Sequence, residues 1–411
     1  MRIPALTIVF LFVFSILVDI YISMDIKQMW KKRSVTIYGL FSLLCYALLI
    51  VALSLPRREA DNDISAVMWL LFTYLTIYSG KLIYCFSSLC GRFFRVITRV
   101  KLPYYPSRWL GVILGLVLMG IMWIGIGYTR HHIVVEQEDF YSKKLPESFQ
   151  DYKIVQLSDL HVGTWGNDTT FIKNLVDTVN SLNPDLIVFT GDIVNRQSKE
   201  LTPFVNVLSG LRAKDGVYSI LGNHDYGDYI EWENALAKEQ NMLRLKNLQR
   251  KMGWKMLNNE SVVLHRDTDS IILIGVENWG EPPFPQYGDL SLALPSGEDD
   301  LKNGKHHQND SNFKILLSHN PEHWNQEVSQ HTNIDLTLSG HTHAMQAMLK
   351  IGDWKWSPAK YRYEQWGGRY DRENENNEPT SLYVNIGTGE VGMPARFLGA
   401  YPEVTLITLK K

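Results

Sequence analysis

The sequence predicts an α-helical membrane region followed by a layered α/β domain. Four long apolar runs occupy residues 1–130, short β-rich runs alternate with helical patterns in the remainder, and polar side chains directly follow several of those β-rich runs. Alternation of this kind is typical of sheets covered by helices. The polar side chains at the strand ends are the candidates for chemistry.

The composition of the two regions differs. All twelve histidines lie at or beyond His131, whereas Cys45, Cys85 and Cys90 precede it in apolar stretches. A disulfide framework in the C-terminal region is therefore excluded. The formal net charge of -2 provides no basic excess, so we expect no nucleic acid as a partner. Hydrophobic residues make up 45% of the 411 residues, which is enough for a sizeable core and more than one domain.

Each of the four apolar runs approaches the roughly 20 residues that a helix needs to cross a bilayer. They are Pro4 to Tyr21, Thr36 to Leu55, Ile64 to Phe86, and Trp109 to Tyr128. The first run is too long for a signal peptide and no small-x-small cleavage site follows it, so it is interpreted as an uncleaved span. Lys81 interrupts the third run; we expect it and Asp19 to lie near helix ends, where neither needs a partner. We expect a membrane domain over residues 1–130.

The orientation of these spans is predicted from the positive charges in the short loops, because Lys and Arg are retained on the cytoplasmic side. Loops one and three carry Lys27, Lys31, Lys32, Arg33, Arg92, Arg95, Arg99, Lys101 and Arg108. The opposite side carries Arg2, Arg57, Arg58 and Arg130. With four spans, the C-terminal domain faces outward from the cytoplasm. If the third run does not span, the same domain is cytoplasmic.

The remaining chain divides into a linker with a predicted edge strand, residues 131–149 with the strand at Ile133 to Glu138, and a catalytic domain, residues 150–411. Within that domain, five β-rich runs end in polar blocks: Lys153 to Leu157, Leu186 to Thr190, Val217 to Leu221, Lys314 to Leu317, and Leu336 to Leu338. Amphipathic patterns over 169–182 and 202–211 predict crossover helices between the first three. Side chains at the carboxyl ends of such strands converge on one crevice.

Three further segments depart from this alternation. Glu281 to Asn312 and Arg369 to Pro379 are polar and are predicted to be surface loops or insertions. Trp354 to Trp366 is rich in aromatic residues, and we favour a packed hairpin there over a wall that faces a substrate.

Five polar blocks follow the strands in a fixed order: Asp-x-His, Gly-Asp, Gly-Asn-His-Asp, an isolated His, and Gly-His-x-His. Their residues are Asp159 and His161, Asp192, Asn223 with His224 and Asp225, His319, and His341 with His343. One such block arises often by chance, whereas all five in order form a specific pattern. From Asp159 to His343 the sequence resembles the calcineurin-like metallophosphoesterase superfamily. Its end, with Gly387-Thr388-Gly389, Arg396, Pro402 and Glu403, resembles the membrane-associated bacterial phosphodiesterases of that superfamily.

This resemblance implies a four-layer α-β-β-α sandwich and two divalent metal ions. Asp159, His161 and His343 would complete the first metal site, and Asn223, His319 and His341 the second. We expect Asp192 to bridge the two ions with one oxygen on each, because Gly191 permits a close backbone approach. Imidazole, carboxylate and amide ligands without cysteine suit Mn, Fe or Zn, and the sequence does not choose among the three.

The same resemblance assigns a separate role to the histidine of the Asn-His-Asp block. His224 would contact the phosphate and protonate the leaving oxygen, while Asp225 would orient it and keep it cationic. A metal-bridging hydroxide would attack the phosphoester in line, without a covalent enzyme intermediate. The other histidines after His132, namely His265, His306, His307, His323 and His331, match no block, and we expect them to be ordinary surface or core residues.

The sequence departs from the family where Gly-Gly-Gln often follows the last block. Here these residues are Ala344, Met345 and Gln346, whose larger side chains could narrow the pocket. We interpret Arg196 as a solvated surface residue rather than a phosphate ligand, and Asp168 as a helix N-terminal residue.

Four functions are compatible with the sequence, of which a transport or signalling unit formed by the four helices is supported only by the charges of Asp19 and Lys81. Of the other three, the first is hydrolysis of a phosphorylated small molecule or a lipid-linked substrate by a membrane-embedded phosphoesterase. The second is a phosphodiesterase for soluble nucleotides, with the helices as a plain anchor. The third, a non-catalytic metal-binding scaffold, would be expected to lack a ligand or His224, and none is missing.

Overall fold

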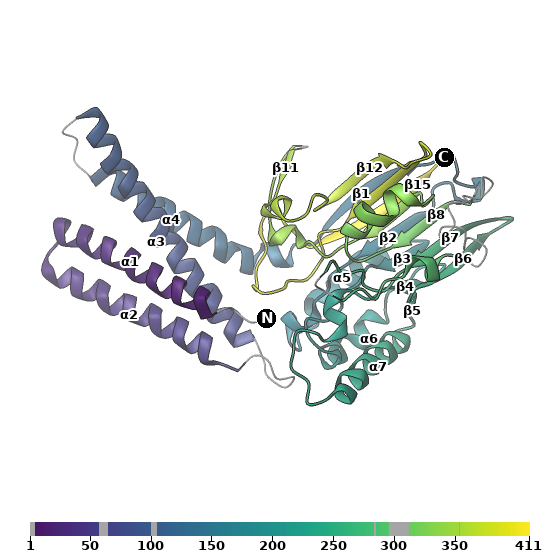
Figure 1. The fold of residues 1–411 in the computed structure, drawn as a ribbon, viewed down its shortest axis with the longest axis horizontal. Coiled ribbons are helices and arrows are strands. Elements are labelled where there is room, and N and C mark those ends of the chain that lie inside the picture. Colours follow the sequence, from purple (N-terminus) through teal and green to yellow (C-terminus); the bar gives the residue numbers. More distant parts are fainter. Residues whose placement is uncertain (1–4, 57–64, 100–104, 283–284, 296–311, 353) are drawn as a thin grey trace. The chain divides into compact units, whose positions relative to one another are not determined.

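A computed structural model describes residues 5–56, 65–99, 105–282, 285–295, 312–352 and 354–411 of the protein. Residues that entered the sequence predictions but lie outside the described ranges are Arg2, Pro4, Arg57, Arg58, Ile64, Lys101, His306 and His307, together with 283–284 and 296–311 of the predicted insertion Glu281 to Asn312. The chain divides into two compact units (Figure 1). The first comprises Met1–Gly127 and Gly392–Ala395, and the second comprises Tyr128–Val391 and Arg396–Lys411.

The first unit contains four long apolar helices. They are α1 (Ala5–Met29), α2 (Lys32–Ser54), α3 (Ser65–Thr98) and α4 (Tyr105–Gly127). By length and composition, each contains a segment that can cross a membrane. The third predicted run, which Lys81 interrupts, corresponds to α3, which is helical over 34 residues. The prediction of four apolar helices is therefore confirmed.

The interior of this helical unit holds a buried charge. Lys81 of α3 donates a 2.7 Å hydrogen bond to Asp19 of α1, and the side chains of both are 8% exposed. Tyr38, Tyr46 and Tyr78 also donate to the Asp19 carboxylate, at 2.5, 2.6 and 2.7 Å. The expectation that Asp19 and Lys81 need no partner is wrong. Where water is excluded, a lysine and an aspartate are stable only when they pair with each other or with other polar groups.

A second buried carboxylate lies further along α1. Asp25 accepts hydrogen bonds from Arg108 of α4 at 2.8 Å, from Ser88 at 2.7 Å and from Tyr84 at 3.2 Å, and it also pairs with Arg92. Because the donors come from α3 and α4, this cluster links three helices through one side chain. Two polar clusters on α1 thus define its packing within the unit.

The second unit is built on two six-stranded sheets and one small sheet. The first sheet has the order β1-β15-β2-β3-β4-β5, with β1 Val134–Tyr141, β2 Lys153–Leu157, β3 Leu186–Phe189, β4 Val217–Ser219, β5 Lys255–Met256 and β15 Glu403–Lys410. The second has the order β12-β13-β9-β8-β7-β6, with β6 Glu260–Arg266, β7 Asp269–Gly275, β8 Lys314–Leu317, β9 Leu336–Ser339, β12 Gly368–Glu373 and β13 Pro379–Val384. The small sheet has the order β11-β10-β14, with β10 Ala347–Ile351, β11 Trp354–Trp356 and β14 Phe397–Leu398.

The layering follows from which face each strand residue occupies. On β7, Ile271 and Leu273 pack into a core shared with Ile154 and Val188 of the first sheet, so the two large sheets pack face to face. The alternate residue Ile272 packs in a different core on the outer face of the second sheet. The four-layer α-β-β-α prediction is therefore confirmed.

Helices cover the two outer faces of the large sheets (Figure 1). The first sheet is covered by α5 (Thr170–Ser181), α6 (Val205–Leu208) and α7 (Ala235–Lys251), and the second by α8 (Leu290–Ala293), α9 (Ser329–His331) and the one-turn π-helix Trp324–Val328.

The predicted elements differ from the structure in three places. The edge strand expected at Ile133 to Glu138 is confirmed as β1, but it is longer and pairs in parallel with β15, so it belongs to the catalytic sheet. The helix expected over 202–211 is α-helical only over α6, Val205–Leu208; before it lies a 3-10 helix, Ser198–Phe204, which contains Pro203. The polar segment Arg369 to Pro379 is not a loop, because β12 forms the edge of the second sheet there. Charged side chains are common on such edges, where they discourage pairing with other chains.

Candidate metal centre

The polar blocks lie where the strands predict them. Asp159 and His161 follow β2, Asp192 follows β3, and Asn223 follows β4; these three strands are parallel, so their ends share one edge of the first sheet. His319 and His341 follow β8 and β9, which are parallel neighbours in the second sheet. The two sheets therefore contribute candidate metal ligands to the same crevice.

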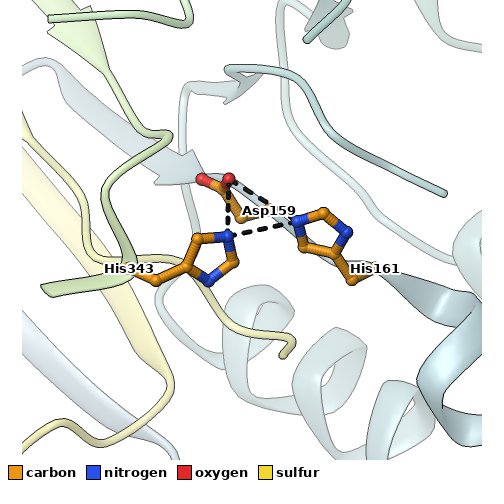
Figure 2. A group of neighbouring side chains, drawn as sticks. All are labelled: Asp159, His161 and His343. Atoms are coloured by element: carbon orange, nitrogen blue, oxygen red, sulfur yellow. Dashed lines mark hydrogen bonds and ion pairs between the residues drawn. The ribbon is translucent and has the colours of Figure 1, made fainter. Parts of the chain in front are cut away.

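One group of side chains consists of Asp159, His161 and His343, all buried (Figure 2). The Nε2 atom of His343 lies 3.1 Å from Asp159 Oδ1 and 3.1 Å from His161 Nε2. No donor in the described part of the chain hydrogen-bonds to Asp159 Oδ1. Three lone-pair atoms that face one another at this spacing are the arrangement that a bound cation stabilises.

A second group consists of Asp192, His319 and His341, joined by the amide of Asn223. His319 Nε2 lies 3.2 Å from Asp192 Oδ2, 3.1 Å from Asn223 Oδ1 and 3.3 Å from His341 Nδ1. His319 Nδ1 donates to the carbonyl of Thr190 at 2.8 Å, which orients Nε2 toward the group. These ligands again combine imidazole, carboxylate and amide.

Asp192 lies between the two groups. Its Oδ2 atom is 3.6 Å from His161 Nε2 of the first group and 3.2 Å from His319 Nε2 of the second. Its Oδ1 atom accepts a 2.8 Å hydrogen bond from the backbone N–H of His224. Both groups therefore face the Oδ2 atom of the same carboxylate.

The backbone at the centre adopts the left-handed conformation at most of the ligand residues. Positive φ values occur at Asp159 (53°), His161 (41°), Asp192 (60°), His341 (74°) and His343 (51°). Non-glycine residues rarely adopt this conformation, and such strain is concentrated at functional sites, where the surrounding structure imposes it. The fold thus holds these five side chains in position at an energetic cost.

The buried carboxylates and imidazoles carry paired charges: burial opposes protonation of His319, but attraction to Asp192 raises its pKa to about 9. Burial alone would raise the pKa of Asp159 and Asp192, but attraction to His343 and His319 holds the pKa of each carboxyl below its usual range, so both stay anionic. Burial lowers the pKa of His161 well below its usual value and that of His341 to about 3, which keeps a lone pair on each imidazole.

Comparison with known proteins gives the family. Residues 152–345 match the family described as calcineurin-like phosphoesterase, and residues 1–129 match the probable calcineurin-like phosphoesterase transmembrane domain. The Bacillus subtilis protein named uncharacterized metallophosphoesterase YkuE is 31% identical over 292 residues, which cover 70% of this chain and 90% of that protein. The chain belongs to the calcineurin-like phosphoesterase family. It is a membrane-linked metallophosphoesterase, a metal-dependent hydrolase of phosphoester bonds.

Other known proteins match part of this chain. The Danio rerio protein named transmembrane protein with metallophosphoesterase domain is 31% identical over 66% of this chain, and the match spans 55% of that longer protein. Among solved structures, the NAD nucleotidase of Haemophilus influenzae aligns with 58% of this chain and 45% of its own, at 18% identity and a TM-score of 0.37.

His224 of this metallophosphoesterase lies beside the first group without joining it. Its ring meets that of His161 edge-on, with 4.8 Å between the centroids. Its Nδ1 lies 2.6 Å from the carbonyl oxygen of Asn195, so Nδ1–H donates to the main chain. The other ring nitrogen, Nε2, is then left for a ligand.

Asp225 does not contact the His224 imidazole, so the expected orienting role is wrong. Its carboxylate instead accepts hydrogen bonds of 2.9 to 3.3 Å from four backbone N–H groups, those of Asp192, Ile193, Val194 and Gly222. A buried carboxylate with four such donors holds together the two loops that carry Asp192 and His224. The His224 imidazole is oriented by the main-chain carbonyl of Asn195 instead of by Asp225.

The residues in place of Gly-Gly-Gln keep a backbone that suits glycine. Ala344, Met345 and Gln346 have φ values of 48°, 46° and 57°. Ala344 is fully buried and Met345 is exposed, while the Gln346 side chain accepts from the N–H of Val391 at 2.6 Å. The loop therefore retains its shape although the side chains are larger.

Two tyrosines at the centre were not predicted as site residues. Tyr229 stacks on His224 with 4.3 Å between the ring centroids, and its hydroxyl accepts from Asn223 Nδ2 at 2.6 Å. The Tyr363 hydroxyl lies 3.2 Å from His341 Nε2. Tyr363 belongs to the aromatic segment that we interpreted as a packed hairpin, and that segment is packed at Trp366 but reaches the metal ligands at Tyr363. Nothing in the sequence distinguishes Tyr229.

The remaining predictions on individual residues have mixed outcomes. Asp168 accepts from the N–H of Thr170 at the start of α5, as expected. His323 is buried and hydrogen-bonds to Ser318 and Glu327, and is an ordinary core histidine. Arg196 is only 6% exposed, so its interpretation as a solvated surface residue is wrong.

Gly222 is expected to be essential for the position of Asp192. A Cβ atom there would lie 2.2 Å from Asp192 Oδ1 and 2.6 Å from Asp192 N. Because overpacking of this kind costs about 1–3 kcal/mol, Gly222→Ala should lower both bound metal and hydrolysis by about tenfold or more. Elemental analysis and a phosphoester assay measure the two effects. In the control Gly120→Ala, the added Cβ meets nothing within 4 Å, and both quantities should stay at the wild-type level.

Proposed function

We propose that the protein is a membrane-anchored dinuclear phosphoesterase that hydrolyses a phosphoester or pyrophosphate bond in a phosphorylated small molecule or a lipid-linked substrate. The supporting observation is the position of Asp192, whose Oδ2 faces a ligand group on each side. In this proposal residues 1–130 form the membrane domain, residues 131–149 lead to the catalytic domain, and residues 150–411 form that domain.

Each ligand group would hold one divalent ion. Asp159, His161 and His343 would bind the first, and Asn223, His319 and His341 the second, with Asp192 shared. When bound, two such ions supply a water of lowered pKa as nucleophile and positive charge for the phosphate and the leaving oxygen. Mn, Fe and Zn all suit this ligand set.

His224 would act on the leaving group. Its Nδ1–H is committed to the carbonyl of Asn195, so the proton available to a substrate is the one on Nε2. The stacked ring of Tyr229 restricts rotation of the imidazole. A positioned acid of this kind donates a proton to the departing oxygen as the phosphorus–oxygen bond breaks.

The competing functions make different predictions. A phosphodiesterase for soluble nucleotides would turn over water-soluble diesters at full rate in detergent, whereas an enzyme for lipid-linked substrates would prefer substrates in a bilayer. A non-catalytic scaffold would bind metal without turnover, and the intact ligand set and the position of His224 disfavour it.

The test is metal analysis and a substrate panel on the purified full chain. The chain should not be shortened to residue 150, because β1 supplies an edge strand that pairs with β15 along eight residues. We expect two divalent ions per chain and hydrolysis of at least one class among phosphomonoesters, phosphodiesters and pyrophosphates, in solution or in nanodiscs. One ion per chain, or two ions with no turnover across the panel, would contradict the proposal.

The catalytic domain is predicted to lie outside the cytoplasm. The prediction comes from the positive charges of loops one and three, which include Lys31, Lys32, Arg95 and Arg99. Protease added to intact cells, or to spheroplasts if an outer membrane is present, should digest residues 150–411 and leave a tag between Arg95 and Arg108 protected. Protection of the domain together with exposure of the tag would reverse the orientation and direct the search toward cytoplasmic substrates.

A further inference from the structure

The hairpin formed by β10 and β11 has one apolar face that the described part of the chain leaves open. Ile351 is directly opposite Trp354, and Leu349 is directly opposite Trp356. Residues paired in this way point to the same side of a sheet, so these four side chains share one face. Ile351 is 71% exposed, Trp354 55% and Leu349 36%.

The opposite face of the same hairpin is basic. Lys350 is directly opposite Lys355, and both are exposed. Lys350 also forms a 2.7 Å ion pair with Glu136 of β1, which ties the hairpin to the edge of the first large sheet. Nearby, Lys360 and the 77% exposed Tyr361 add a further cation and a further aromatic ring. In Figure 1 the hairpin that carries β11 extends beyond the two large sheets.

An exposed apolar face beside a basic face is unusual on a protein surface that contacts only water. Scattered apolar residues are common there, but an aliphatic and aromatic cluster on one face of a projecting strand pair indicates an interaction surface. Tryptophan and tyrosine are enriched at the interface between membrane and water, and lysine side chains beside them favour anionic headgroups. The chemistry of both faces therefore matches a bilayer surface.

The chain also keeps the catalytic unit close to a bilayer. Helix α4 ends at Gly127 and β1 begins at Val134, so only six residues connect them. The Cα atoms of Gly127 and Val134 can therefore be at most about 25 Å apart. A surface held this close meets the membrane at high effective concentration, so weak insertion of a few side chains is sufficient.

We propose that the β10–β11 hairpin is a membrane-contacting element that inserts Ile351 and Trp354 into the interfacial layer of the bilayer. Leu349 and Trp356 follow them on the same face, while Lys355 and Lys360 contact lipid phosphates. This inference does not depend on which phosphoester the protein hydrolyses.

Insertion of the hairpin has a consequence for the metal centre. Strand β10 begins at Ala347, directly after the loop 343–346 that carries the ligand His343. A hairpin anchored in the interface would therefore set the height of this ligand loop above the bilayer. Substrates whose phosphate lies at the level of the headgroups would then reach the centre without leaving the membrane.

The test is fluorescence quenching from two sides on the full chain in phospholipid nanodiscs. The background is Cys90→Ser, because Cys90 is exposed whereas Cys45 and Cys85 are buried. Bimane is attached to Ile351→Cys in one sample and to Trp354→Cys in a second. The control is Leu243→Cys on α7, a leucine of 54% exposure in the same unit. The quenchers are a nitroxide lipid in the bilayer and iodide in the water.

We expect the nitroxide lipid to quench the labels at 351 and 354 several-fold more than the label at 243, and iodide to show the reverse order. Iodide quenching at 351 and 354 equal to that at 243 would overturn the proposal. Shielding of both labels from both quenchers would also overturn it, because protein rather than lipid would then cover the face. Wild-type metal content in each labelled variant shows that the centre remains folded.

Discussion

Asp192→Asn should abolish phosphoester hydrolysis and reduce the bound metal below two ions per chain. The Oδ2 atom of Asp192 lies within 3.6 Å of imidazole nitrogens from both ligand groups, so this carboxylate faces both groups. An amide would remove the negative charge that two adjacent cations would require, and its nitrogen has no free lone pair for a metal. Elemental analysis and an assay with saturating Mn, Fe or Zn measure the two losses.

The matched control for this substitution is Asp177→Asn. Asp177 is an exposed aspartate on α5, outside both ligand groups, so its loss removes one carboxylate without touching the centre. This variant should retain two ions and wild-type turnover. Two tightly bound ions and normal turnover in Asp192→Asn would show that Asp192 does not bridge the ions.

His224→Ala should keep about two ions per chain and yet slow hydrolysis by on the order of 10² to 10⁴, which is the usual contribution of a positioned acid or base. The imidazole donates through Nδ1 to Asn195 and stacks on Tyr229, but it belongs to neither ligand group. The loss should be smaller for substrates with a good leaving group, because these need less proton transfer. A series of aryl phosphate esters with different leaving-group pKa values measures this dependence.

His331→Ala is the control, since His331 is exposed and pairs with the exposed Glu375 at 3.4 Å on the surface of the second unit. It should leave both metal content and rate unchanged. Loss of metal in His224→Ala would instead make His224 a ligand. An equal loss across the whole ester series would indicate that His224 binds the phosphate without protonating the leaving group.

The strand positions and the residues of the ligand groups could be predicted because each corresponds to a short, local sequence pattern. The runs before Asp159, Asp192 and His319 are short, apolar and β-branched, and each stops at a polar block. The spatial grouping of Asp159, His161 and His343 then follows from strands whose ends share a crevice.

The partner of His224 could not be predicted in this way. It is the main-chain carbonyl of Asn195, and a carbonyl is present at every residue, so no side chain marks it. We predicted Asp225 as this partner because it is adjacent to His224 in the sequence. Its carboxylate instead accepts hydrogen bonds from backbone N–H groups of the neighbouring loop. Which group hydrogen-bonds to His224 depends on how the two loops pack against each other. The pattern of residue types in the sequence does not indicate that packing.

The partners of Asp19 were missed for a related reason. Position along a helix predicts how close a charge lies to the headgroups, but it does not show which face of a neighbouring helix is polar. Lys81 is 62 residues away in the chain, and Tyr38 and Tyr46 lie on a different helix again. Only the packed helices bring them together.

The separation between Asp19 and Lys81 bears on how the chain enters the membrane during its synthesis. A single aspartate or lysine in a spanning helix opposes insertion by about 2.5–3.5 kcal/mol. Helix α1 emerges from the ribosome long before Lys81, but Tyr38 and Tyr46 of α2 follow it closely and can share the carboxylate. The first helical hairpin therefore has hydrogen-bond donors for its charge while α3 is still being translated, and α3 later adds Lys81 and Tyr78 to the same carboxylate.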